Sequence, residues 1–109
     1  KGYRVLRIPV SNPSSEGLPD VLASRNEHLY AFEVKNQDFY CYVEKAQIGK
    51  LFTFLDVFSL YPESLKHAII AAHLGKKWVF HEVSRDEFDK LPPEGKIRVL
   101  KRDRGNWKP

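Results

Sequence analysis

Residues 29 to 35, Leu-Tyr-Ala-Phe-Glu-Val-Lys, constrain the fold of this chain more than any other segment. Side chains of an extended strand point alternately to the two faces of a sheet. Glu33 and Lys35 would therefore share one face, while a helix would separate them by about 200°. The apolar side chains of the opposite face are Tyr30, Phe32 and Val34. The pattern predicts a strand that ends with a carboxylate and an ammonium on one face.

A second carboxylate precedes this strand by a short distance. Asp20 follows Pro19 and stands thirteen residues before Glu33. Residues 21–23 form a short apolar strand, and residues 25–27 predict a hairpin turn into the next strand. Two adjacent antiparallel strands would bring Asp20 close to Glu33.

Two carboxylates and a nearby ammonium are what a Mg²⁺-dependent site for phosphodiester cleavage requires. Carboxylate oxygens suit a hard divalent cation that holds the scissile phosphate. A cationic side chain orients the attacking water or stabilises charge on the phosphate. A plainer interpretation stays open, in which Asp20 only starts a strand and Glu33 and Lys35 are solvated charges on an exposed sheet face.

The segments around this motif occur in a recognisable order. Residues 7–11, Arg-Ile-Pro-Val-Ser, precede a polar loop that leads into Leu18-Pro19-Asp20, and residues 42–47, Tyr-Val-Glu-Lys-Ala-Gln, follow the Glu-Val-Lys strand. In this order the segments resemble the archaeal Holliday junction resolvases, a family of the PD-(D/E)XK nuclease superfamily. The resemblance runs from Lys1 to about Phe58, and more loosely through the two strands that follow.

The resemblance implies a role for each matching position. Asp20 and Glu33 would bind the metal, and Lys35 would be the catalytic lysine. Ser11 would belong to a mobile loop over the scissile phosphate and would act in catalysis and DNA binding. Arg7 would contact DNA near the site, and Gln47 would line it.

Family members also carry an upstream helix with a further acidic metal ligand, before the segment that matches residues 2–5. The sequence printed here starts at Lys1. Either the chain is a natural short form, or that helix lies outside these residues. Without such a helix, DNA binding could persist in the absence of cleavage.

The remaining segments predict a single α/β domain over residues 1–109, with a restriction-endonuclease-like mixed central sheet flanked by helices. We expect a first strand over residues 3–9, a helix over 43–58, two strands over 68–72 and 78–83, and an edge strand over 97–100. Ser84 with Glu87 predicts a capping box for a short helix that ends near Leu91.

The helix over residues 43–58 carries more apolar surface than one sheet contact needs. One stripe holds Ile48, Leu51, Phe52 and Leu55, and Phe54 and Phe58 widen it. Two explanations are open: a deeply buried helix, or a helix that leaves Phe54 and Phe58 for a second subunit. We favour the second because members of the resembled family are two-fold dimers.

The charge distribution points to a polyanionic partner. The chain of 109 residues has a formal charge of +4 and a pI of about 9.2. Residues 95–109 hold six basic side chains against Asp103, a net of +5. We expect a basic C-terminal tail over about 101–109 to bind DNA phosphates, although a solvated, disordered tail has the same composition. The tail residues assigned to DNA are Lys101, Arg102 and Arg104.

Cysteine usage and hydropathy bear on location. Cys41 is the only cysteine, so no disulfide can form within the chain, and the four histidines lack the paired spacing of a structural zinc site. No apolar stretch is long enough to cross a bilayer, and no secretory signal pattern is present. We therefore expect a cytoplasmic protein that does not associate with membranes.

Together these observations predict a homodimeric endonuclease that resolves four-way DNA junctions by paired nicks. Asp20, Glu33 and the carbonyl group of Val34 would hold Mg²⁺, for which Mn²⁺ is an alternative. Three other classes stay open: a restriction or repair nuclease that acts on duplex DNA, a non-catalytic DNA-binding module, and a structural domain that binds no DNA.

Overall fold

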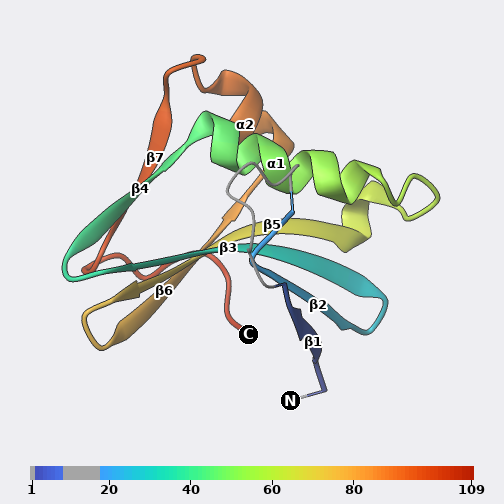
Figure 1. Ribbon diagram of the computed structural model, residues 1–109, viewed down its shortest axis with the longest axis horizontal. Coiled ribbons are helices and arrows are strands. Elements are labelled where there is room, and N and C mark those ends of the chain that lie inside the picture. Colours follow the sequence, from blue (N-terminus) through green and yellow to red (C-terminus); the bar gives the residue numbers. More distant parts are fainter. Residues whose placement is uncertain (1, 9–17) are drawn as a thin grey trace.

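A mixed five-stranded sheet forms the centre of the protein (Figure 1). The computed structural model describes residues 2–8 and 18–109. The strand order is β1-β2-β3-β5-β6, and a separate two-stranded sheet is made of β4 and β7. The elements are β1 (Arg4–Arg7), β2 (Val21–Arg25), β3 (His28–Gln37), β4 (Tyr40–Glu44), α1 (Lys45–Asp56), the 3₁₀ turn η1 (Glu63–Leu65), β5 (Lys66–Leu74), β6 (Lys77–Val83), α2 (Arg85–Lys90) and β7 (Lys96–Leu100).

The predicted hairpin between β2 and β3 is confirmed. Arg25 pairs with His28, so the connection has only two residues, Asn26 and Glu27. Both have positive φ angles, 52° and 70°. This conformation is required by the two-residue turns whose twist matches that of the flanking strands. The turn therefore fixes the register that carries Asp20 alongside the end of β3.

The strand β3 pairs in parallel with β5, whereas the other pairs of the main sheet are antiparallel. A parallel pair needs a long crossover, and α1 lies within it. Its buried residues are the predicted stripe Ile48, Leu51, Phe52 and Leu55. The helix spans Lys45–Asp56, which is shorter at both ends than the predicted 43–58. Its start is later because residues 40–44 are extended and pair with residues 96–100. Residues 97–100 thus join β4 rather than the edge of the main sheet.

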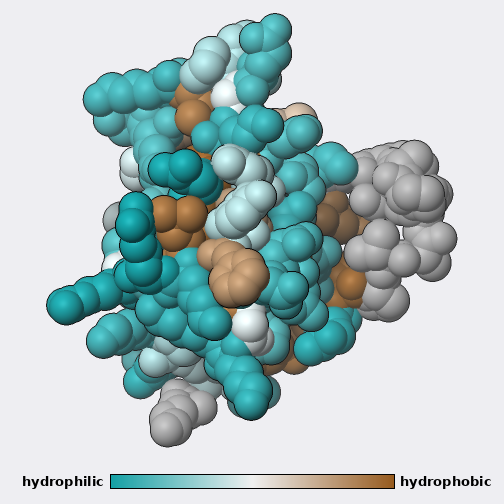
Figure 2. All heavy atoms as spheres, turned by 90° about the vertical axis from the view of Figure 1, so that its left-hand side faces the viewer, coloured by the Kyte–Doolittle hydropathy of each residue, from teal (hydrophilic) through white to brown (hydrophobic). Residues whose placement is uncertain are grey.

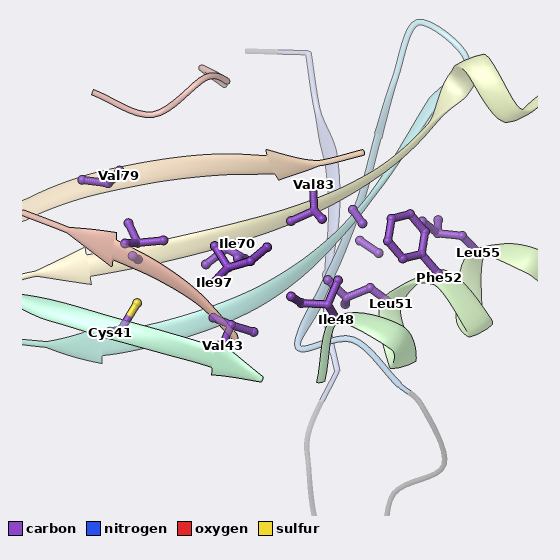
Figure 3. Packing of buried hydrophobic residues seen from close by; sticks show 14 of the residues in the cluster. Cys41, Val43, Ile48, Leu51, Phe52, Leu55, Ile70, Val79, Val83 and Ile97 are labelled. Atoms are coloured by element: carbon purple, nitrogen blue, oxygen red, sulfur yellow. The ribbon is translucent and has the colours of Figure 1, made fainter. Parts of the chain in front are cut away.

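The main hydrophobic core lies between the sheet and α1 (Figure 3). Figure 3 shows the α1 stripe directed toward Ile70 and Val83 of the sheet, with Cys41, Val43 and Ile97 contributed by the two-stranded sheet. Leu29 and Ala31 of β3 are buried in the same core. The face of β3 that carries Glu33 and Lys35 is therefore the face that packs against the helix.

Both helices lie on this same side of the sheet in Figure 1. They contact each other through Phe52 and Phe88, whose ring centroids are 5.2 Å apart. The short helix α2 begins as predicted, since the Ser84 side chain accepts a hydrogen bond from the Glu87 N–H. The α/β class with a mixed central sheet is confirmed.

The opposite face of the sheet carries a smaller, largely aromatic cluster built on Tyr30 and Phe32, with Ile69 buried in the same cluster. Trp107, near the C-terminus, packs edge-on against Phe32 and Phe80 at centroid distances of 5.6 and 5.5 Å. Residues 101–109 therefore do not extend away from the domain: their last part returns across the sheet. None of the helices in the described ranges is long and apolar enough to cross a membrane.

Candidate functional site

Asp20 is held at the start of β2 by the backbone on both sides. Its N–H donates to the carbonyl of Phe32 at 3.0 Å, and its own carbonyl accepts from the N–H of Ile8 at 2.9 Å. The preceding Pro19 is fully buried, which anchors the entry into the strand. The Asp20 Oδ2 atom accepts the N–H of Val34 at 2.9 Å. These bonds place the carboxylate against β3, next to Glu33.

Glu33 and Lys35 project from the same face of β3, as the alternation predicts. The Lys35 Nζ atom lies 3.9 Å from Glu33 Oε2, and the two side chains are 24% and 16% exposed. Val34, the proposed carbonyl ligand, lies between them and binds Asp20 through its N–H. The structure thus brings Asp20, Glu33, Val34 and Lys35 together at one end of the β2–β3 pair.

Gln47, in the first turn of α1, joins the helix to this group. Its Nε2 atom donates to Glu33 Oε2 at 3.2 Å. Its Oε1 atom accepts the N–H of Glu44 at 3.2 Å. Because a backbone N–H can only donate, the second bond fixes the orientation of the amide and directs its NH₂ group at Glu33. Gln47 is therefore a positioning residue for the Glu33 carboxylate.

The surroundings of Glu33 disfavour its charged form. Burial, and to a smaller extent the negative charge of Asp20, raise the pKa of Glu33 from 4.5 to about 7, while Lys35 and Lys50 oppose the rise. Two carboxylates that share a site compete for ionisation, and a cation between them removes the conflict. Lys50 was not predicted as part of this group. Its spacing of three residues from Gln47 on the helix is the signal that identifies it.

The donor set fits Mg²⁺. This ion is usually bound by one or two carboxylates, with water and substrate phosphate oxygens completing the shell. Asp20 and Glu33 supply two carboxylates, and the raised pKa of Glu33 marks a place where positive charge is favourable. Within residues 2–8 and 18–109, the acidic, histidine and cysteine side chains form no group of three that could hold a metal.

The other predicted site residues are distributed less tightly. Ser11 lies outside the described residues. Arg7 is exposed at the end of β1 and lines a cavity of about 920 Å³ together with Asp20. This cavity opens on the aromatic face of the sheet, where Phe32 and Trp107 also line it. Its wall is mainly apolar. Asp20 and Val34 border it, whereas Glu33 and Lys35 belong to the other face of the sheet and do not line it.

The predicted basic residues of the C-terminal segment follow β7 directly. The Lys101 N–H donates to the carbonyl of Phe39 at 2.8 Å, and the Lys101 ammonium lies over the Phe39 ring. Arg102 and Arg104 are exposed. Nearby, Asn106 binds the edge strand β6: its N–H donates to Phe80 O at 3.0 Å. The Asn106 side chain accepts the Glu82 N–H at 2.6 Å and donates to the Glu82 carbonyl at 3.1 Å.

Comparison with known proteins is consistent with this geometry. Residues 1–99 match the family model described as archaeal Holliday junction resolvase, Hjc. A crossover junction endodeoxyribonuclease of Sulfolobus islandicus rod-shaped virus 1 is 42% identical over 60 residues, which is 53% of this chain and 49% of that protein. The crossover junction endodeoxyribonuclease Hje of Sulfolobus acidocaldarius is 38% identical over 61 residues, 55% of this chain and 44% of that protein.

The alignment with these curated relatives thus spans about half of their length. A 1.6 Å structure of Hjc from Archaeoglobus fulgidus, a Holliday junction resolvase, superposes with a TM-score of 0.62 at 26% identity, covering 88% of this chain and 73% of that one. The family match extends over most of the sequence and includes every candidate site residue named above except those of the C-terminal segment beyond residue 99. The chain belongs to the archaeal Holliday junction resolvase family.

Proposed function

We propose that this protein is a Mg²⁺-dependent endonuclease that nicks four-way DNA junctions. The observation that carries the proposal is the convergence of Asp20, Glu33 and Lys35 at one end of the β2–β3 pair. Membership of the resolvase family and the similarity to crossover junction endodeoxyribonucleases support junction DNA as the substrate. The formal charge of +4 favours a polyanionic substrate.

The residues of the site divide the chemistry between them. Asp20 and Glu33 would hold Mg²⁺ with the Val34 carbonyl, and Mn²⁺ is an alternative ion. When bound, the ion supplies a Lewis acid and lowers the pKa of a water molecule. Lys35 would stabilise the negative charge that develops on the phosphate. Gln47 holds the Glu33 carboxylate in one orientation, and Arg7 and Ser11 would contact the DNA strand beside the scissile phosphate.

Paired nicks require two copies of this site. We propose a homodimer in which Phe54 and Phe58 lie at the interface, since Phe58 is exposed two residues after the end of α1 and packs edge-on against Phe54, with ring centroids 5.5 Å apart. A two-fold dimer presents two identical sites, and a four-way junction is itself nearly two-fold. Symmetric strands would then be cut.

Cleavage of a labelled four-way junction in Mg²⁺ tests the function. Asp20→Asn and Glu33→Gln should abolish cleavage, because each removes a metal-binding charge, while junction affinity stays close to that of the wild type. Asp89→Asn and Glu94→Gln are matched controls at exposed positions and should cut normally. Cleavage by either site variant at the wild-type rate would refute the assignment. Preferential cutting of a linear duplex of the same sequence would identify a duplex nuclease instead.

A further inference from the structure

The two-stranded sheet of β4 and β7 has an outward face that carries aromatic and basic side chains. Residues of each strand alternate between the core and solvent: Cys41, Val43, Ile97 and Val99 are buried. The intervening side chains point outward. We call four exposed side chains of this face, Tyr40, Tyr42, Lys96 and Arg98, the ribbon platform.

The aromatic rings of the ribbon platform are open to solvent. Tyr40 is 52% and Tyr42 is 44% exposed. Their ring centroids are 5.5 Å apart and the rings are inclined by 71°. Tyr42 lies directly across from Arg98, and the Lys96 Nζ atom is 5.1 Å from the centre of the Tyr42 ring. Phe39, at the same end as Lys101, is 69% exposed.

The basic side chains of this face carry charges that no ion pair among the described residues neutralises. Lys96, Arg98 and Lys101 form no ion pair with any residue in the described parts of the chain. The acidic residue of the outward face is Glu44, opposite Lys96. Figure 2 shows this side of the molecule, where hydrophilic side chains dominate and single apolar side chains interrupt them. Exposed rings interleaved with unpaired cations fit a ligand with flat apolar surfaces and negative charges.

The ribbon platform also adjoins the candidate site. Strand β4 follows β3 within three residues of Gln37, and it leads directly into α1. The Glu44 N–H at its end binds the same Gln47 side chain that binds Glu33. A DNA strand held at the two carboxylates therefore has the ribbon platform as a neighbouring surface.

Building on the proposed function, we infer that the ribbon platform binds unpaired nucleotides of the DNA strand beside the cleavage site. Tyr40 and Tyr42 stack on bases that have left the double helix, and Lys96 and Arg98 bind the phosphates between them. Base stacking on aromatic side chains tolerates any sequence, because every base has a flat face. A fully paired duplex buries these faces and would use the cations alone.

Fluorescence anisotropy with a labelled oligothymidylate, in a chelator to prevent cleavage, tests the stacking. Tyr42→Ala should weaken binding about fivefold or more, which is the lower range for loss of one stacked base. Tyr42→Phe keeps the ring and should bind like the wild type. A blunt duplex should show little difference among the three proteins. As a second readout, the emission of 2-aminopurine in the oligonucleotide should be quenched by the wild type and less by Tyr42→Ala.

The salt dependence of the same binding tests the cations. For single strands, the slope of log K against log salt becomes shallower by about 0.7 for each phosphate that the protein no longer neutralises. Lys96→Gln and Arg98→Gln should each flatten the slope by about that amount. Lys90→Gln makes the same charge change on α2, where the side chain is 76% exposed, and should leave the slope unchanged.

The results of these binding experiments test the ribbon platform independently of the proposed function. Wild-type protein that does not bind oligothymidylate, or Tyr42→Ala that binds as tightly as the wild type, would overturn the ribbon platform as a site for unpaired nucleotides. Junction cleavage in Mg²⁺ would then still stand on Asp20 and Glu33. If the wild type binds oligothymidylate through the ribbon platform but never cuts a junction, the proposed function fails and the binding surface remains. Circular dichroism of every variant confirms that the fold is intact.

Discussion

Glu33 is a mostly buried carboxylate that lies beside Asp20. Its burial and this neighbouring charge determine how the site responds to pH. Its folded-state pKa of about 7 exceeds its ordinary value of 4.5. The folded protein therefore binds the Glu33 proton more tightly than the unfolded chain does. The associated stability is fully present below about pH 4.5 and is lost as the pH rises toward 7. Above that pH the folded state carries an unfavourable buried charge unless a cation offsets it.

We predict that Glu33→Gln stabilises the metal-free protein at pH 8 but not at pH 4, because glutamine keeps the contact with Gln47 and carries no charge. The gain in unfolding free energy should be about 2 to 3 kcal/mol at most. Added Mg²⁺ should stabilise the wild type and have less effect on the variant. Urea denaturation at both pH values, with chelator or Mg²⁺, measures this. Glu94→Gln is the control, and an equal gain at both pH values would contradict the pKa assignment.

Among the structural elements, the C-terminal segment covers the edge of strand β6. Exposed strand edges invite pairing with other chains, and Asn106 occupies the backbone groups of Phe80 and Glu82. Gly105 makes this approach possible. Its φ angle is +73°, and a Cβ atom at this position would lie 2.2 Å from the Phe80 carbonyl oxygen. A segment that sequence composition describes as a basic tail thus ends as part of the packed domain.

We predict that Gly105→Ala releases this segment from the sheet. The combined cost of the left-handed conformation and the steric conflict should lower the unfolding free energy by about 1 to 3 kcal/mol. Trp107 should move from its aromatic cluster into water, which a red shift of tryptophan emission would report. Arg104→Ala changes the neighbouring exposed residue and should leave both stability and emission near the wild-type values. An unchanged emission maximum in Gly105→Ala would show that the segment tolerates the methyl group.

The exposed apolar surface after α1 bears on assembly of the whole molecule. Val57 is 73%, Phe58 37% and Leu60 99% exposed, while Phe54 packs partly against the main core. The two residues of the predicted interface therefore differ. Phe58 is available to a partner, whereas Phe54 also packs within the monomer. A patch of this kind is typical of an interaction site.

We predict that the combined variant Phe58→Gln and Leu60→Gln is a folded monomer that nicks junctions singly rather than in pairs. Both side chains lie outside the main core, so circular dichroism should remain that of the wild type. Analytical ultracentrifugation measures the mass. The ratio of linear to singly nicked product from a cruciform plasmid shows whether the two nicks are made as a pair. Phe54→Gln should instead lose stability because its ring contacts the core. A wild type that sediments as a monomer at micromolar concentration would contradict the dimer.

The amino-acid sequence alone determined the local features that build the site. Alternation over residues 29–35 and a hairpin turn within residues 25–27 are short-range properties, and they suffice to place Asp20 near Glu33 and to put Lys35 on the same face. The apolar stripe of α1 and the Ser84 cap are equally local. Each depends on side chains within a few residues of one another, so periodicity and capping preferences reveal it.

The tertiary structure alone decided the features that join distant segments. Pairing of residues 40–44 with 96–100, the bridge from Gln47 to Glu33, and the return of Trp107 across the sheet each join positions between 14 and some 75 residues apart. No local preference encodes such contacts, because they form only when the whole core fixes the paths of both segments. For the same reason, the exposed rings and cations of the ribbon platform become one surface only in the folded protein.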